Sequence, residues 1–392
     1  MNPGLNEDSF LEGLRVLLVA QYGHMGGTRT YFKQLVQFYL QQGAQIAVIR
    51  LGPKNDRDMD EYLGAKSISQ IDFSSYTEAP KTHWFPIQSR SAINREIQRE
   101  TEIFRTISKQ YESDLLVASI GNPGSLLGAL NAVERSIYIV HTYPHGIRSF
   151  LSSRQRMPKA IPETASLVTV SDYARRRLLK AWRLHERKRG VSVLYSTAGS
   201  LTSEPSCVGT SHMVLTSGHV EDYKDPLGWI EIAATVTSQP GLEETRFVWV
   251  GDGSLLSKCR RLARQRGLEN QVEFVGLKSD LQVYYEDCSV YFQPSRVESL
   301  GLSVLDAARH GIPAVVTDIG GLPEIVESGT TGFVYPAGKQ LSAAHLISSL
   351  LNDSDERERM GFQARRKYVD QFSPESWAAG LLDLHLDQIR PF

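Results

Sequence analysis

The feature that most constrains the fold is a regular alternation of short, continuously apolar segments with longer helical stretches along the whole chain. Uninterrupted apolar runs are typical of strands that a parallel sheet buries on both faces. Strand–helix–strand repetition predicts the α/β class with right-handed crossovers. The expected strands are residues 14–20, 45–50, 115–120, 136–140, 166–170 and 191–195, followed by 213–217, 246–250, 272–276, 289–293 and 313–317.

The alternation starts afresh after residue 200. A stretch rich in Ser, Thr and Gly, residues 196–212, precedes the second series of strands and is typical of an interdomain linker. At roughly 150 residues per domain, a chain of 392 residues holds two or three domains. We therefore expect two doubly wound domains of similar size that face a central cleft, with ligands bound beyond the carboxyl ends of the strands.

The composition excludes several classes of protein. Hydrophobic residues make up 41% and charged residues 22%, which is ordinary for a globular protein and unlike a disordered or collagen-like chain. No apolar run reaches the ~18 residues of a membrane-spanning helix, and the acidic, polar start of the chain is unlike a secretory signal. The three cysteines, Cys207, Cys259 and Cys288, lie far apart. Their spacing argues against a disulfide framework or zinc site and favours a cytoplasmic location.

The net charge of −1 hides a split between the two halves. Residues 1–200 carry 26 Lys and Arg against 18 Asp and Glu, whereas residues 201–392 carry 17 against 26. Much of the positive charge lies at 172–189, a segment with a plausible N-cap, Ser171, and an expected end at Gly190.

We expect residues 172–189 to form a basic amphipathic helix, with Leu178, Leu179 and Trp182 on one side. Such a helix suits an anionic membrane surface, and the alternative is an ordinary solvated helix face. The near-neutral total charge and the lack of a recognition motif argue against nucleic acid as a partner.

Two features of the first half lie at strand ends. Gly26 and Gly27 precede a helix whose expected N-cap is Thr28. Such a turn presents backbone N–H groups to an anion or a sugar hydroxyl, although a tight turn without a ligand fits equally well. His141 directly follows the strand at 136–140, where its imidazole either faces the cleft or lies satisfied in the core.

Residues 293–336 carry the strongest signal. Glu298 lies in the loop after a strand, Gly301 opens a helix that contains Asp306, and a second glycine turn at 320–321 precedes another helix. Two adjacent loops with helix N-termini behind them suit a diphosphate, and the carboxylates are placed to accept hydrogen bonds from sugar or ribose hydroxyls.

These residues resemble the family-4 retaining glycosyltransferases, whose GT-B fold has two Rossmann-like domains. The family's paired glutamates correspond to Glu298 and Asp306, and its Gly-Arg…Lys stretch corresponds to residues 218–224, with His219 at the Arg position and Lys224 retained. Val-Gly-Asp-Gly at 250–253 also matches; as a dinucleotide-binding fingerprint it is only partial, which favours a glycine turn at a strand end. Further matches are the Gly-Ile-Pro at 311–313, the segment 320–326 and, in the first half, Gly26, Gly27 and His141.

The resemblance implies a role for each matched residue. Lys224, helped by His219, would neutralise the diphosphate of the donor, Glu298 would hold sugar hydroxyls, and Asp306 would reach the ribose hydroxyls. His141 would hydrogen-bond the transferred sugar near its anomeric carbon. The other implied donor contacts are Gly26, Gly27, the backbone around Leu300, Gly301 and Leu302, and, near the base, Gly276, Leu277 and Lys278.

The resemblance also implies the domains and the reaction. Residues 1–195, with a C-terminal helix at about 375–392 crossing back, would bind the acceptor, and residues 196–374 would bind the nucleotide-sugar. The sugar would pass, with retention, from a UDP-sugar in preference to GDP-mannose to a hydroxyl of a carbohydrate or lipid-linked acceptor, in polysaccharide, lipopolysaccharide or glycolipid synthesis. Because Lys224 and helix dipoles can stabilise a diphosphate, we expect no metal and no cofactor. The alternatives are a sugar-nucleotide epimerase, a phosphorylase and a non-catalytic sugar-nucleotide-binding scaffold.

Overall fold

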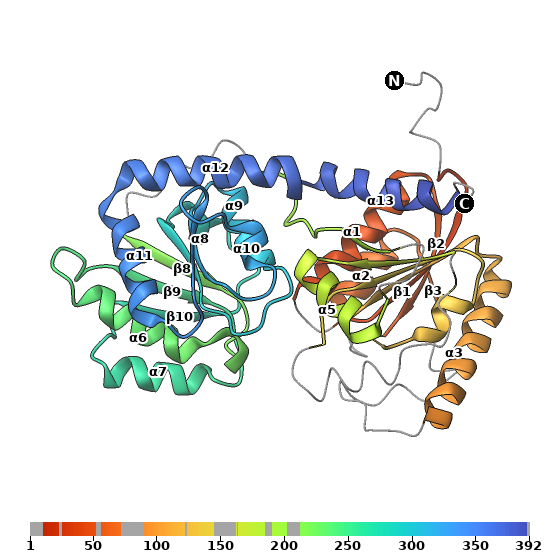
Figure 1. The fold of residues 1–392 in the computed structure, drawn as a ribbon, viewed down its shortest axis with the longest axis horizontal. Helices are drawn as coiled ribbons and strands as arrows, with labels where there is room; N and C mark the ends of the chain where they lie inside the picture. Colours follow the sequence, from red (N-terminus) through yellow and green to blue (C-terminus); the bar gives the residue numbers. More distant parts are fainter. Residues whose placement is uncertain are drawn as a thin grey trace, which may run out of the picture. The chain divides into compact units, whose positions relative to one another are not determined.

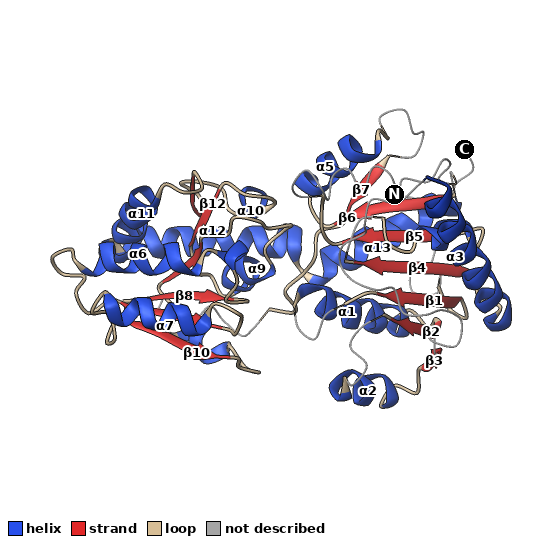
Figure 2. Ribbon diagram, turned by 90° about the horizontal axis from the view of Figure 1, so that it is seen from below, coloured by secondary structure: helices blue, strands red, loops and turns tan. Residues whose placement is uncertain are grey.

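The structure is a computed structural model that describes residues 11–22, 26–51, 56–71, 90–121, 124–144, 162, 164–184, 190–201 and 212–389. Contacts within the chain divide it into two compact units. The N-terminal unit comprises Met1–Leu194 and Ala378–Phe392, and the C-terminal unit comprises Tyr195–Trp377. Each unit is a parallel β-sheet with helices packed against it (Figures 1 and 2).

The described strands of the N-terminal unit form a parallel sheet in the order β3-β2-β1-β4-β5-β6-β7. The chain adds strands on one side of β1 and then on the other, which is the doubly wound arrangement. Most side chains of the five inner strands are buried, as the continuous apolar runs predict, whereas the edge strands β3 and β7 are more exposed. The strands are β1 (Arg15–Ala20), β2 (Gln45–Arg50), β3 (Ser69–Ile71), β4 (Leu115–Ile120), β5 (Ser136–Val140), β6 (Ala165–Thr169) and β7 (Val191–Val193).

Helices from both ends of the chain pack in the N-terminal unit. Phe104, Tyr138 and Trp182 are fully buried in it. Residues of the last helix also join this unit, since His385 Nε2 lies 3.0 Å from Tyr39 Oη on α1. The helices are α1 (Gly27–Gln41), α2 (Arg57–Gly64), α3 (Arg90–Tyr111), η3 (Leu127–Asn131), α5 (Asp172–Trp182) and α13 (Pro374–Ile389), the last beginning in the C-terminal unit.

The described strands of the C-terminal unit repeat the same plan in the order β10-β9-β8-β11-β12-β13, again all parallel. Here the reversal lies between β8 and β11. The strands are β8 (Met213–Ser217), β9 (Arg246–Val250), β10 (Val272–Gly276), β11 (Val290–Gln293), β12 (Ala314–Thr317) and β13 (Gly332–Tyr335).

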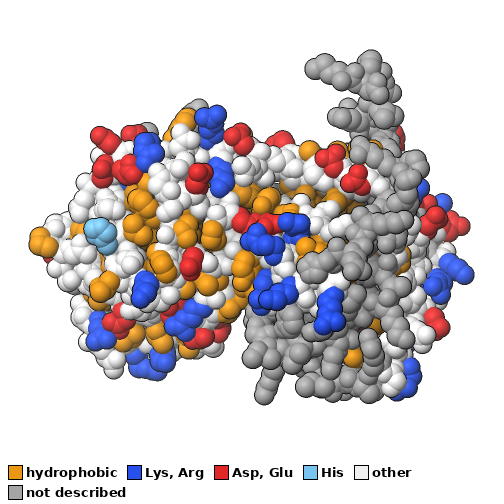
Figure 3. All heavy atoms as spheres, in the orientation of Figure 1, with side chains coloured by type: hydrophobic (Ala, Val, Ile, Leu, Met, Phe, Trp, Pro, Cys, Tyr) orange, Lys and Arg blue, Asp and Glu red, His pale blue; other side chains and the backbone are white. Residues whose placement is uncertain are grey.

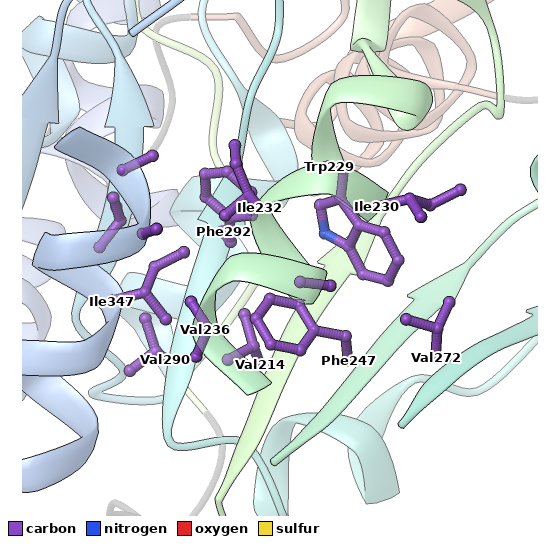
Figure 4. Packing of buried hydrophobic residues seen from close by; sticks show 14 of the residues in the cluster. Val214, Trp229, Ile230, Ile232, Val236, Phe247, Val272, Val290, Phe292 and Ile347 are labelled. Atoms are coloured by element: carbon purple, nitrogen blue, oxygen red, sulfur yellow. The ribbon is translucent and has the colours of Figure 1, made fainter. Parts of the chain in front are cut away.

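A tightly packed aromatic core holds the C-terminal sheet to its helices. The Trp229 ring on α6 meets Phe247 and Trp249 edge to face, at centroid distances of 5.5 and 5.3 Å. Ile232, Val236 and Ile347 belong to the same buried cluster (Figure 4). Such aromatic pairs stabilise by about 1 kcal/mol beyond the area they bury. The helices are η4 (Asp222–Lys224), α6 (Pro226–Thr237), α7 (Leu256–Gln265), α8 (Gln282–Glu286), α9 (Leu302–Arg309), α10 (Leu322–Ile325), α11 (Gln340–Asn352) and α12 (Ser354–Phe372).

The eleven predicted strands all appear, within two residues of their expected ends, and the α/β doubly wound class is confirmed. Two strands were missed. β3 and β13 lie at the sheet edges and have only 3 and 4 residues, so neither forms an apolar run long enough to stand out.

The prediction of a basic helix over 172–189 needs correction. Ser171 caps α5 by accepting a hydrogen bond from Ala174 N, but the helix ends at Trp182, where Arg183 adopts the left-handed conformation. Residues 185–189 lie outside the described part of the chain. Leu178 and Trp182 are buried in the core of the unit, with Leu179 packed against it. The apolar side of this helix therefore faces the protein interior.

The surface carries mixed charge. On the face drawn in Figure 3, acidic and basic side chains are interspersed over the C-terminal unit, so its net negative charge is not gathered into one patch there. Within the described residues, none of the helices combines the length and the apolar character needed to cross a bilayer.

Candidate functional site

The best-placed site in the C-terminal unit lies where β8 and β11 run side by side. The strands on one side of this point follow β8 in the chain, and those on the other side follow β11. The loops leaving the two carboxyl ends therefore diverge, and in open α/β sheets this point is where ligands bind. The loop after β8 carries His219 and Lys224, and the loop after β11 carries Glu298.

The structure brings Lys224 and Glu298 into direct contact. Lys224 Nζ lies 2.5 Å from Glu298 Oε2, and the two side chains are only 11% and 16% exposed. An ammonium and a carboxylate held this close, with little water around them, attract each other strongly. A bound ligand carrying both anionic groups and hydroxyls finds a matching cation and acceptor at one spot.

Arg296, which the sequence analysis did not single out, ties the two loops together. Its backbone N–H donates to Tyr223 O at 2.8 Å. Its guanidinium bonds Asp225 at 2.7 Å and Asp222 at 3.3 Å. The carboxylate of Asp225 also caps α6, by accepting from Gly228 N. The loops are thus one hydrogen-bonded assembly.

His219 stands at the edge of the site and is partnered by a tyrosine. Its Nδ1 lies 2.8 Å from the Tyr223 hydroxyl. Lys224 Nζ lies 5.8 Å from the centroid of the same tyrosine ring. Burial, with the negative charges of Glu298 and Glu221, raises the pKa of Tyr223 to about 12, so the hydroxyl keeps its proton at neutral pH.

The glycine turn before α10 is shaped to hold the Glu298 loop. Gly320 has φ +65°, and a Cβ at this position would lie 1.7 Å from the backbone oxygen of Glu298. Only glycine permits both this conformation and this approach. The segment Leu300-Gly301-Leu302 leads into α9, with Gly301 as its N-cap at φ +113°.

Asp306 is engaged by a neighbour on its own helix. Its carboxylate pairs with Arg309 at 2.8 Å, and Arg309 also donates to Ser200 O at 2.9 Å. Burial raises the pKa of Asp306 to about 6, against the opposing effect of Arg309. The expected role of Asp306 toward ribose hydroxyls stays a prediction. In that role the carboxylate would have to bind the hydroxyls while it is paired with Arg309.

Two predicted segments lie beside the loop after β8. The Gly-Asp-Gly turn packs on it, because a Cβ on Gly251 would lie 1.9 Å from Gly218 O. Glycine is therefore needed at position 251 because the two backbones approach each other closely. Gly276 ends β10 and receives the Gly251 N–H at 2.9 Å, and Leu277 beyond it is half exposed. Lys278 follows Leu277 in an exposed loop.

In the N-terminal unit, His141 is buried and satisfied by a side chain. It follows β5, its Nε2 lies 2.8 Å from Ser119 Oγ, and its ring packs edge to face on Tyr31 of α1. Burial lowers the pKa of His141 to about 4. The imidazole is therefore neutral at pH 7, and its side chain is buried.

The turn before α1 differs from the prediction. Gly26, at φ +108°, is the N-cap, and the helix begins at Gly27 rather than after Thr28. Thr28 therefore lies inside the first turn. Because Tyr31 of this helix contacts His141, the glycine turn and the histidine belong to one locally packed region of the unit.

A pair of aspartates with Asp-x-Asp spacing, Asp56 and Asp58, was overlooked in the sequence. Both carboxylates bond Arg29, at 2.8 and 2.5 Å, and Asp56 also caps α2 through Met59 N. Their charge is already compensated within the N-terminal unit, which accounts for the pair structurally.

Comparison with known proteins adds independent information on the C-terminal unit. Residues 205–367 match the family model described as "Glycosyl transferases group 1". N-acetyl-alpha-D-glucosaminyl L-malate synthase of Bacillus anthracis is 27% identical over 147 residues, which is 38% of this chain and 39% of that protein. Alpha-D-kanosaminyltransferase of Streptomyces kanamyceticus is 31% identical over 154 residues, 39% of each chain. The matched region thus spans about two fifths of the length of these two relatives.

Solved structures resemble the whole chain at lower identity. A glycosyltransferase from Rickettsia africae superposes with a TM-score of 0.76 at 15% identity, over 97% of this chain and 100% of that one. HepE of Anabaena, solved in complex with UDP and glucose, superposes with a TM-score of 0.71 at 16% identity, over 95% and 100%. These likenesses confirm the two-domain fold expected from the sequence.

The buried state of His141 predicts an acid-dependent loss of stability. Its pKa is about 4 in the folded chain and about 6.5 when unfolded, so the unfolded state takes up the proton first. Stability from this source is complete above about pH 6.5 and falls as the pH drops toward 4, by about 2 kcal/mol between pH 7.5 and 5. Hydrogen–deuterium exchange of β5 and β6 amides should show this loss, reduced in His141→Gln.

His345→Gln serves as the control, because this histidine is exposed on α11 in the other unit. It should leave the pH dependence of β5 and β6 unchanged. An identical acid slope in the parent chain and in His141→Gln would show that the His141 imidazole is protonated as easily in the folded state as in the unfolded one.

Proposed function

We propose that the chain is a retaining glycosyltransferase that moves a sugar from a nucleotide-sugar to a hydroxyl acceptor, because residues 205–367 match the family model of the glycosyl transferases of group 1. The observation that carries the proposal is the Lys224–Glu298 pair, 2.5 Å apart, at the point of the C-terminal sheet where ligands are expected. A pair of this kind offers a cation to a diphosphate and an acceptor to sugar hydroxyls.

In this proposal the C-terminal unit holds the donor. Lys224 stabilises the negative charge that develops on the departing diphosphate, and the backbone N–H groups around Gly301 add to it. Glu298 accepts hydrogen bonds from the sugar and turns its anomeric carbon toward the acceptor. No metal ion or cofactor has a part in this scheme.

The N-terminal unit supplies a neutral partner. His141 keeps no positive charge at pH 7, so it acts as a hydrogen-bonding group and not as a cation. We propose that it contacts the transferred sugar near the anomeric carbon. Attack from the face of the leaving group, with the leaving phosphate taking the acceptor's proton, accounts for retention without a nucleophilic carboxylate.

The donor and acceptor are proposed by class. The support for UDP over GDP comes from HepE of Anabaena and TarM of Staphylococcus aureus, both solved with UDP. A relative from Mycobacterium tuberculosis named as a GDP-mannose-dependent mannosyltransferase, 30% identical over 161 residues, keeps GDP-mannose as the second choice. We propose a carbohydrate or lipid-linked hydroxyl as acceptor. A thermal-shift screen against sugar nucleotides tests the donor directly, since a ligand of the native state raises its apparent stability.

Removing either member of the pair should nearly abolish transfer. Glu298→Ala and Lys224→Ala are each expected to lower the initial rate of sugar transfer at least about a hundredfold, because each removes a group that acts on the reacting end of the donor. Glu298→Gln keeps the volume of the side chain and separates lost charge from lost packing. The rate is measured with the sugar nucleotide identified by the thermal-shift screen.

The control for these variants is Glu231→Ala. Glu231 on α6 pairs with Arg266 at 2.8 Å, so its loss breaks an ion pair of the same unit away from the site. It should leave transfer unchanged. Rates within a few-fold of the parent for Glu298→Ala and Lys224→Ala would remove the basis of the proposal, and donor binding with neither transfer nor hydrolysis would favour the scaffold alternative.

His219→Arg should leave transfer equal or increase it. Arginine stays charged and offers a planar, bidentate fork to phosphate, whereas imidazole is a weaker, pH-dependent cation. His219 is partly exposed at the rim of the site. The measurement is the donor KM and kcat at pH 7, with His219→Ala as the control expected to raise KM. A loss of more than about tenfold in kcat/KM for His219→Arg would contradict a phosphate-facing position.

We further propose that the basic part of α5 attracts an anionic membrane surface by charge alone, since its apolar side is buried. Arg176 and Lys180 are exposed on this helix. Cosedimentation with phosphatidylserine vesicles should fall with salt and with the double variant Arg176→Glu/Lys180→Glu, because screening and charge reversal both weaken the attraction. Lys258→Glu/Arg261→Glu on α7 changes the net charge equally and serves as control. Equal binding to neutral phosphatidylcholine vesicles would dismiss the idea.

A further inference from the structure

A chain of buried polar side chains lies behind the Lys224–Glu298 pair, and the proposed reaction does not use it. Tyr291, Gln293 and Ser295, on and after β11, have no exposed surface at all. A buried polar group costs free energy unless it is hydrogen-bonded. The hydrogen-bond partners of these three residues therefore indicate the role of this group of side chains.

Gln293 is the centre of this chain. Its Oε1 receives the hydroxyl of Tyr291 at 3.1 Å and that of Ser303 at 3.2 Å. Its Nε2 donates to Ser295 Oγ at 2.7 Å. The Ser303 hydroxyl donor on one side of the amide and the Ser295 acceptor on the other set the orientation of the side chain, while the single Tyr291 proton has Ser217 O as a second acceptor at 3.3 Å.

The Gln293 amide in turn sets the direction of the Ser295 hydroxyl. Because Ser295 Oγ accepts from the amide, its single proton is left for Glu298 Oε2, which lies 3.4 Å away. The backbone of Ser295 is held independently, since Thr317 Oγ1 donates to its carbonyl oxygen at 2.7 Å. The hydroxyl thus points at one oxygen of the Glu298 carboxylate, the same oxygen that Lys224 contacts.

The other end of the chain reaches β8. Tyr291 Oη accepts from the backbone N–H of Ser217 at 3.0 Å, and Ser217 directly precedes the loop that carries His219 and Lys224. Ser303 lies in the first turn of α9. One side chain, Gln293, therefore connects the ends of two strands and the start of a helix that surround the proposed donor site.

We infer that Gln293 and Ser295 are positioning residues for Glu298: they hold its carboxylate in the orientation that receives the sugar of the donor. The inference rests on the proposed function, because it assigns Glu298 to the sugar and Lys224 to the diphosphate. An apolar side chain fills buried space at no cost in unsatisfied groups. Stability alone therefore does not account for an amide at a fully buried position.

Binding of UDP and of UDP-glucose, compared by titration calorimetry, separates a positioning role from a structural one. Ser295→Ala and Gln293→Met should weaken UDP-glucose by about tenfold and leave UDP unchanged, because UDP has no sugar for Glu298 to hold. Ser348→Ala is the matched control. Ser348 is a buried serine of the same unit on α11, and removing its hydroxyl should change neither affinity.

A second measurement tests whether the effect passes through Glu298. In the Glu298→Ala background, Ser295→Ala should weaken UDP-glucose no further, because the group that it positions is gone. An additional loss in that background would overturn the inference, and so would a parallel loss of UDP and UDP-glucose in Ser295→Ala.

The outcomes for the proposed function and for this inference are distinct. If the parent chain binds neither UDP nor UDP-glucose, GDP and GDP-mannose are titrated in the same way. If the parent binds no nucleotide of either pair, the proposed function is wrong and the inference falls with it. If the parent binds the sugar nucleotide and the variants match it, only the positioning role is wrong.

Discussion

The Lys224–Glu298 ion pair is the interaction on which the site depends, and its existence follows from the order of the strands. β8 and β11 are neighbours although more than 70 residues separate them, as the register between Val290 and Val214 shows. Their carboxyl ends deliver the two loops to one place. Both charged side chains are little exposed, so each needs a partner of opposite charge. Removing one member of such a pair costs about 3–5 kcal/mol, because the other charge is left buried and uncompensated. The ion pair therefore keeps both charges compensated.

Close backbone approaches and side-chain hydrogen bonds connect the loops of this site. Gly320 lets the turn before α10 touch the backbone of Glu298, and Gly251 does the same for the loop after β8. Arg296 joins the two loops, and the buried Gln293 amide bonds Ser295 in the loop after β11. Few of these contacts involve groups that a substrate would meet. In the proposed reaction they would fix the positions of the few groups that meet the substrate, so that these need not reorganise at each turnover.

Much of this arrangement was predictable from the sequence, and the exceptions share a cause. The buried strands stand out because a sheet covered on both faces needs uninterrupted apolar residues. Glu298 stands out because glycine turns and helix starts surround it, whereas Lys224 stands out only through the resemblance to a known family. Arg296 and Gln293 do not, because an arginine among aspartates and a glutamine after a strand look the same whether they bond distant partners or water. The prediction for α5 was wrong for a related reason. A basic, half-apolar segment has the same sequence pattern whether its apolar side contacts lipid or the protein core around Trp182.

The sequence by itself determined the class of fold, the strands and the chemical types gathered at their ends, because hydrophobic periodicity and glycine placement are local properties that each segment carries alone. Only the tertiary structure decided which of those groups meet. It joined Lys224 to Glu298, gave Asp306 to Arg309, and buried His141 against Ser119 so that its imidazole stays neutral. Distances and burial arise from packing between segments far apart in the chain, and the charge state of a side chain follows from that packing.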